Sequence, residues 1–240
     1  MKDAGGADSV WIGKLTRREF RERRDRGDLS VCIIPVAATE QHLEHLAMEH
    51  DYRSCLHVAE QIALSLHPHV AVAPLMHVGI SEHHMKHPGT LTASPGSWLG
   101  VVWDGVRSAL EAGFEHVVIL NGHGGNSAPM EGVWSQFLQR YEASLFFHSY
   151  WDFVDPDFAN QYLETKRCPG HAQEFETAVA LALFPENVRT DAMRDQPDQE
   201  PLAATAETGA KFLEHIIERG SQFVEAVRQG KVSADIPPFH

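Results

Sequence analysis

Short apolar runs alternate along the chain with longer segments in which apolar residues recur at helical spacing. The runs predict buried strands over residues 31–36, 70–75, 116–120 and 145–148. The helical spacing and its capping and stop residues predict helices over residues 16–27, 51–68, 97–112, 126–141, 171–183 and 206–229. Because apolar strands and helices alternate, we expect a parallel sheet covered by helices on both faces. The predicted fold is α/β, a three-layer α/β/α sandwich with a mostly parallel sheet.

Three stretches lack a clear period and are predicted to be irregular. Residues 76–96 are rich in histidine, residues 150–170 are aromatic and acidic, and residues 185–201 are acidic and contain prolines. No internal repeat, low-complexity tract or break in composition divides the chain. We therefore expect residues 1–240 to form a single domain, for which this length suffices.

Composition narrows the range of functions. Of the 240 residues, 43% are hydrophobic and 22% are charged, as in an ordinary globular protein. The 20 Lys and Arg residues against 33 Asp and Glu residues leave a net charge of −13, which argues against nucleic-acid binding. No apolar stretch approaches the roughly 18 residues of a membrane span, and no signal pattern opens the chain. Three cysteines without C-x-x-C spacing indicate neither a disulfide framework nor a zinc finger, so a cytoplasmic location is expected.

Candidate chemistry is concentrated in three clusters of carboxylates and imidazoles. Two clusters follow predicted strands and one opens a predicted helix; their members are Glu40, His42 and Asp51, then His123 in the run Asn-Gly-His-Gly-Gly-Asn, then His171 and Glu176. Because ligands bind beyond the carboxyl ends of parallel strands, the first two clusters are expected to meet. Their oxygen and nitrogen atoms suit zinc, manganese or iron(II). The clusters favour a metal-dependent hydrolase.

Each cluster also has a structural alternative. The first could be a charged surface loop, the second a tight turn, and Glu174 and Glu176 could simply favour a helix N-terminus. Against the surface loop, a carboxylate directly after a buried strand is costly unless it is paired or metal-bound. Other hydrolase chemistries lack their motifs, since the chain has neither G-x-S-x-G nor H-E-x-x-H.

The ordered set of motifs resembles the creatininase (creatinine amidohydrolase) family. The matching segments span about residues 31–190 and are Glu40-Gln41-His42, Asp51 eleven residues after Glu40, His87-Pro88-Gly89-Thr90-Leu91, Asn121 to Asn126, His171-Ala172 and Glu176-Thr177. The resemblance implies two divalent metal ions, one held by Glu40 and His123 and the second by His42, with Asp51 bridging them.

The chain departs from creatininase itself at Gly125, where the resemblance implies a further carboxylate ligand. Glu176 is the candidate for this missing ligand, either on the metal or as a base. A second departure is Leu43-Glu44 beside the site. Both departures predict that creatinine is a poor substrate.

The expected reaction is hydrolysis of a carbon–nitrogen bond, other than a peptide bond, in a small cyclic amide or related carbonyl compound. Two ions about 3.5–4 Å apart would lower the pKa of a bridging water to give the nucleophile, with His171 as proton donor. The residues expected to line the substrate side are Ser81, Glu82, His83, Gly124 and Trp151. Alternatives are opening of a keto-cyclitol ring by carbon–carbon cleavage, removal of a formyl group, or metal binding without catalysis.

The chain is also expected to assemble with itself. The resemblance implies a homohexamer, with a dimer as the alternative. The aromatic residues Tyr150, Trp151, Phe153, Phe158 and Tyr162 lie in a stretch without a period, where they could form an exposed interface. The alternative is an aromatic lid over the chain's own active site. A small-molecule substrate is expected, and neither nucleic acid nor membrane.

Overall fold

The computed structural model of the chain describes residues 3, 5–140 and 143–234. Within this part of the chain one sheet contains four parallel strands in the order β2-β1-β3-β4. They are β1 (Val31–Val36), β2 (Val70–Val72), β3 (His116–Asn121) and β4 (Ser144–Ser149). The central strands β1 and β3 pair along their full length, with Val36 opposite Asn121. Their carboxyl ends therefore lie side by side.

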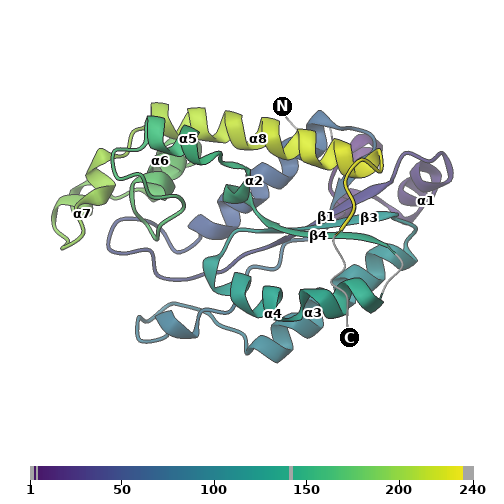
Figure 1. Ribbon diagram of the computed structural model, residues 1–240, viewed down its shortest axis with the longest axis horizontal. Coiled ribbons are helices and arrows are strands. Elements are labelled where there is room, and N and C mark those ends of the chain that lie inside the picture. Colours follow the sequence, from purple (N-terminus) through teal and green to yellow (C-terminus); the bar gives the residue numbers. More distant parts are fainter. Residues whose placement is uncertain (1–2, 4, 141–142, 235–240) are drawn as a thin grey trace.

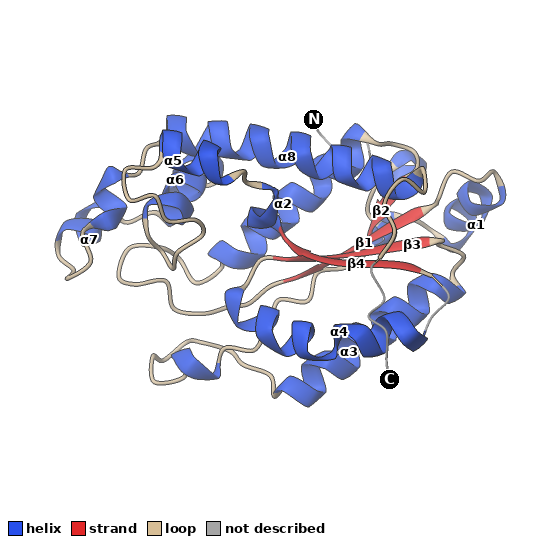
Figure 2. Ribbon diagram, viewed as in Figure 1, coloured by secondary structure: helices blue, strands red, loops and turns tan. Residues whose placement is uncertain are grey.

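Helices cover both faces of this sheet, as Figures 1 and 2 show. One face carries α2 (His50–Ser65) and α8 (Ala206–Arg228), with α6 (Glu174–Leu183) beside them, and the other carries α3 (Pro95–Glu111) and α4 (Ser127–Arg140). The shorter helices are α1 (Arg17–Asp25), α5 (Pro156–Tyr162) and α7 (Thr190–Arg194). The predicted three-layer sandwich is confirmed. None of the described helices has both the length and the apolar character needed to cross a membrane.

Two apolar cores, one on each face, explain why the strands are apolar throughout. Successive side chains of a strand point to opposite faces. Val31 and Ile33 of β1 join the core under α2 and α8, whereas Cys32 and Ile34 join the core under α3 and α4. Each fully buried aliphatic side chain contributes about 1.5–3 kcal/mol, so burial on both faces holds the sheet in place.

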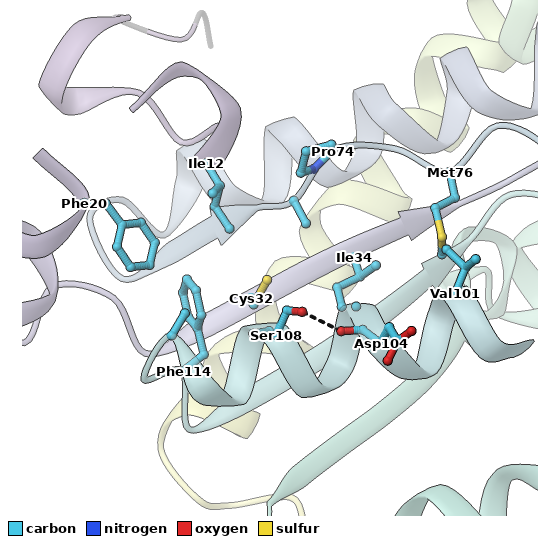
Figure 3. A pocket seen from close by; sticks show the side chains of 14 residues that line it. Ile12, Phe20, Cys32, Ile34, Pro74, Met76, Val101, Asp104, Ser108 and Phe114 are labelled. Carbon is cyan, nitrogen blue, oxygen red and sulfur yellow. Dashed lines mark hydrogen bonds between the residues drawn. The ribbon is translucent and has the colours of Figure 1, made fainter. Parts of the chain in front are cut away.

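An apolar hollow of about 450 Å³ opens on the second face, between α3 and the segment that precedes the sheet (Figure 3). Phe20 and Val101 lie on opposite sides of it, and Cys32 of β1 lies between them. Its polar side chains are Asp104 and Ser108, and the Ser108 hydroxyl donates a hydrogen bond to the backbone carbonyl of Asp104. The described residues that line this hollow include no imidazole, so it is separate from the clusters that carry the candidate chemistry.

Local signals predicted most elements, with shifted ends. Thr16 caps α1 as predicted, because its hydroxyl accepts a hydrogen bond from the backbone N–H of Glu19. The second strand ends at Val72 rather than at residue 75, since Pro74 has no N–H to donate to a neighbour. Helix α3 begins earlier than predicted, at Pro95, because proline fits a first helical turn. The predicted end of α4, residue 141, lies outside the described residues.

The predicted helix start at residue 171 is wrong. Helix α6 begins at Glu174, and Ala172 before it has a φ of 54°, in the left-handed region that an α-helix excludes. His171 therefore lies in the loop before α6. Residues 185–201, predicted to be loop, contain α7, and residues 150–170 contain α5.

The aromatic residues of the segment 150–162 pack within the chain. Tyr150 is fully buried, the ring of Phe158 contacts that of Phe212 on α8 at a centroid distance of 5.1 Å, and Phe153 contacts Phe223 at 5.7 Å. The expectation of exposed rings is wrong for Tyr150, whereas Trp151, Phe153, Phe158 and Tyr162 are half-buried. An interface at this segment stays a prediction. The homo-oligomer itself remains a prediction.

Candidate metal centre

The site is assembled where β1 and β3 end. Glu40 follows β1, His123 follows β3, and Asp51 lies in the first turn of α2. The Glu40 Oε1 atom is 3.3 Å from Nδ1 of His123, and all three side chains are buried. The two clusters that were predicted to meet at the carboxyl edge of the sheet do so.

Asp51 lies between two imidazoles. Its Oδ1 atom is 2.9 Å from Nε2 of His42, and its Oδ2 atom is 3.1 Å from Nδ1 of His123. Oε2 of Glu176 is 3.9 Å from the same Nε2 atom of His42. A carboxylate that points one oxygen at each of two ligand groups has the geometry of a bridging ligand.

Backbone carbonyls determine which nitrogen of each imidazole faces the carboxylates. Nδ1 of His42 is 3.0 Å from the backbone carbonyl oxygen of Glu40, and Nε2 of His123 is 3.1 Å from that of Ile80. Since a carbonyl only accepts, these nitrogens carry the ring hydrogen. Nε2 of His42 and Nδ1 of His123 are thereby left free for a metal ion, an arrangement usual for metal-binding histidines.

Small and amide side chains hold the turn that presents His123. A Cβ atom on Gly122 would lie 2.7 Å from the backbone oxygen of Asp51, so only glycine lets α2 approach this closely. The side-chain oxygen of Asn121 accepts hydrogen bonds from the backbone N–H of His123 and from the amide of Asn126. The glycine-rich run therefore serves close approach of the backbone, as its sequence predicted.

Burial and charge shift the pKa values of the cluster. Burial lowers the pKa of His42, but the carboxylate of Asp51 outweighs it and raises the pKa to about 9. Burial likewise lowers the pKa of His123, and Asp51 and Glu40 raise it to about 10. Burial raises the pKa of Glu176 to about 8, despite the opposing effect of His42. Imidazoles that hold protons this strongly lie in the negative field of buried carboxylates, which also attracts metal cations.

Unpartnered polar atoms show that the cluster fits a divalent ion. Glu40 Oε2, His42 Nε2 and Asp51 Oδ2 are buried and have no hydrogen-bond partner, although the last two face the charged groups described above. Leaving such atoms unpaired is costly unless something else coordinates them. The ligand groups form three sets whose donor atoms lie within 4.8 Å of one another: Glu40–His42–His171, Glu40–His83–His123 and His42–Asp51–Glu176.

The structure separates two glutamates that both suit a helix N-terminus, of which only Glu176 was predicted as a ligand. Glu174 accepts hydrogen bonds from the backbone N–H groups of Glu164 and Thr165, so it holds a neighbouring loop. Glu176, two residues on, faces the cluster instead and accepts a hydrogen bond from the backbone N–H of Ala172.

Gln41 is a site residue that the motif reading did not single out. Its side-chain nitrogen lies 2.8 Å from Nδ1 of His84 and 2.9 Å from Nε2 of His171. Its side-chain oxygen accepts from the backbone N–H of Leu43, which leaves the amide to donate to both rings. The remaining nitrogens of the two rings face Glu40 Oε1, each at 3.7 Å. The signal in the sequence was the position of Gln41 between two candidate ligands.

The residues predicted for the substrate side are spread around the cluster. Ser81 is buried with its hydroxyl 3.1 Å from Nε2 of His123, whereas Glu82, His83 and Gly124 are exposed. Trp151 is half-buried against the ring of Tyr150 and lines a hollow beside the start of α4. Their roles in binding remain predictions.

The fold and the site together define an α/β/α sandwich with a candidate metal centre at the carboxyl ends of its central strands. The chain belongs to the creatininase family: the family's sequence profile, described as creatinine amidohydrolase, matches residues 13–203. It is thus a creatininase-family hydrolase, as its motifs indicated.

Related proteins in this family differ in substrate. The chain is 33% identical to creatinine amidohydrolase of Pseudomonas putida, over 79% of this chain and 77% of that protein. It is 28% identical to 3-dehydro-scyllo-inosose hydrolase of Thermotoga maritima (74% and 57%). It is 30% identical to the mycofactocin precursor peptide peptidase of Mycolicibacterium smegmatis (75% and 66%). The last two matches span less than two thirds of the relative, and family membership does not specify the substrate.

Solved creatininase structures share the fold. A manganese form aligns with a TM-score of 0.77 at 25% identity, over 96% of this chain and all of that chain. A variant of zinc–zinc type aligns with a TM-score of 0.76 at 27% identity, over 96% of this chain and 99% of that chain. Manganese and zinc are two of the metals that the ligand types predicted.

Proposed function

We propose that the chain is a two-metal hydrolase that opens a small cyclic amide or a related carbonyl compound at a carbon–nitrogen bond. The observation that carries this proposal is the position of Asp51, with one oxygen facing each of two oriented imidazoles. Glu40 and His123 would hold one ion and His42 and Glu176 the other. When bound, such ions acidify water and polarise a carbonyl group.

The chain's own groups position the reactants. Burial and the charge of His42 lower the pKa of His171 to about 4, so this imidazole is neutral. Because Gln41 donates to Nε2 of His171, its N–H is at Nδ1 and faces the cluster. We assign His171 as a hydrogen-bond donor to the substrate or leaving group.

Chelation tests whether the reaction needs metal ions, and a panel of substrates then tests the substrate class. Chelation is expected to abolish hydrolysis of a lactam, because the proposed reaction depends on the metal ions. Re-addition of zinc or manganese is expected to restore it. The panel also contains creatinine, a formamide, a keto-inositol and a short peptide, since relatives act on a cyclitol and a peptide. We expect creatinine to be turned over with kcat/KM below ~10⁴ M⁻¹s⁻¹. Activity that survives full metal removal would contradict the proposal. If only the keto-inositol is hydrolysed, the substrate is a keto-cyclitol and not an amide.

Substituting Gln41 tests whether the orientation of two histidines matters. Gln41→Leu removes both donated hydrogen bonds, so His84 and His171 lose the partner that selects their tautomer. We expect kcat to fall about 10–100-fold, as for other partners of site histidines, with metal content unchanged. Gln139→Leu, at an exposed position of α4, is the matched control. Unchanged kcat and unchanged histidine ¹⁵N shifts in Gln41→Leu would contradict this role.

We further propose a homo-oligomer, a hexamer or a dimer, and a cytoplasmic location. The oligomer rests on the family resemblance, since the aromatic segment packs within the chain. The location is supported by three cysteines that are free thiols, Cys32, Cys55 and Cys168. Light scattering measures the oligomeric state. A species of 26.7 kDa would be a monomer and would contradict the proposed oligomer.

A further inference from the structure

Each half of the centre has three side chains that can complete it. The half at His42 has His42, Glu176 and the shared Asp51, and the half at His123 has His123, Glu40 and the same Asp51. Protein sites for divalent transition metals have at least four ligands, of which three or more come from side chains. The half at His123 reaches this minimum with a water as its fourth ligand, so a further side chain there would take the place of that water.

His83 is placed at that position. It belongs to the 3₁₀ turn Glu82–His84, and its donor atom lies within 4.8 Å of those of Glu40 and His123. The ring of His83 is nearly parallel to that of His123, with an interplanar angle of 9° and centroids 5.9 Å apart. It is the exposed member of this set, whereas Glu40 and His123 are buried.

The segment that carries His83 occupies the space beside Gly125. A Cβ atom on Gly125 would lie 2.2 Å from the backbone oxygen of Ile80 and 2.9 Å from Cε1 of His83. The first contact is with backbone and cannot be relieved by a rotamer change, so no ligating side chain fits at position 125 unless residues 80–83 move. The present position of His83 therefore requires that residue 125 has no side chain.

The geometry points to His83 as a metal ligand that completes the half of the centre formed by Glu40, His123 and Asp51. This inference rests on the proposed two-metal site. Because His83 is exposed on the turn Glu82–His84, its imidazole would close that ion from the solvent side. If His83 is a ligand, the position of the turn Glu82–His84 depends on whether the metal ion is bound.

Zinc titration of the metal-free chain by calorimetry tests the inference without any substrate. The wild-type chain is expected to bind two ions. In His83→Ala one of the two is expected to bind at least about tenfold more weakly, because one ligand is lost. His83→Glu, which restores a ligating atom at the same position, is expected to recover most of this affinity. His87→Ala is the matched control, an exposed histidine of the same segment outside the three ligand sets.

Two zinc sites of unchanged affinity in His83→Ala would overturn the inference, and His83 would then be a substrate contact at most. A wild-type chain that binds only one ion would overturn it too, together with the two-metal site. Failure of the proposed reaction is a separate outcome, since the titration is independent of turnover. Loss of affinity in His83→Ala that His83→Glu does not recover would indicate a structural role and also count against coordination.

Discussion

Asp51→Asn is expected to remove both metal ions and to reduce kcat/KM by at least about a thousandfold, equivalent to about 4 kcal/mol. The carboxylate faces His42 with one oxygen and His123 with the other. The amide keeps one oxygen and turns an N–H₂ group, which cannot bind a cation, toward the second imidazole. Elemental analysis of the purified variant gives the metal content, and assay on the best substrate of the panel gives kcat/KM.

Two further variants make this result specific. Asp104→Asn, an exposed aspartate of α3, should keep both ions and full activity. His42→Ala should chiefly lower the occupancy of one ion, because His42 contacts only one oxygen of Asp51. If Asp51→Asn retains two ions per chain, Asp51 does not bridge them.

Gly209→Ala is expected to lower the free energy of unfolding by at least about 3 kcal/mol, at the upper end for overpacking. Gly209 lies in α8 where it crosses α6, and a Cβ atom there would sit 1.9 Å from the backbone oxygen of Ala178. Since the contact is with backbone, α6 itself must move, and Glu176 moves with it. Urea denaturation measures the stability loss, and zinc affinity should fall in the same variant.

Gly132→Ala provides the matched comparison. Gly132 is an exposed position of α4, and a Cβ atom there would meet nothing within 4 Å. Replacing a helical glycine by alanine is favourable by about 0.5–1 kcal/mol. Equal stability of Gly209→Ala and Gly132→Ala would show that α6 and α8 can separate without cost.

The sheet and the main helices were predictable because their signals are local. A strand buried on both faces is apolar at every position, as in Val31–Val36, and Thr16 with Glu19 forms its capping box within four residues. Glu40 and His123 were also predictable as neighbours, since parallel strands that pair bring their carboxyl ends together.

Other features depended on contacts between distant segments. Position in the helix alone could not separate Glu174 from Glu176, because both suit a helix N-terminus. The family resemblance pointed to Glu176, and the contacts with the neighbouring loop and with His42 distinguish the two. The pattern of the aromatic segment from Tyr150 does not show that it packs against α8, because that contact is with residues far along the chain.

By itself, the sequence determined the α/β/α order, the family and the main set of candidate ligands, because periodicity and motif spacing are properties of neighbouring residues. Only the tertiary structure decided which atoms face one another. Gln41 reaches His171 across 130 residues of sequence, and Asp51 reaches His123 only because Gly122 lets α2 approach β3. The direction of a side chain depends on such packing between distant segments, which the pattern of residues along the chain does not specify.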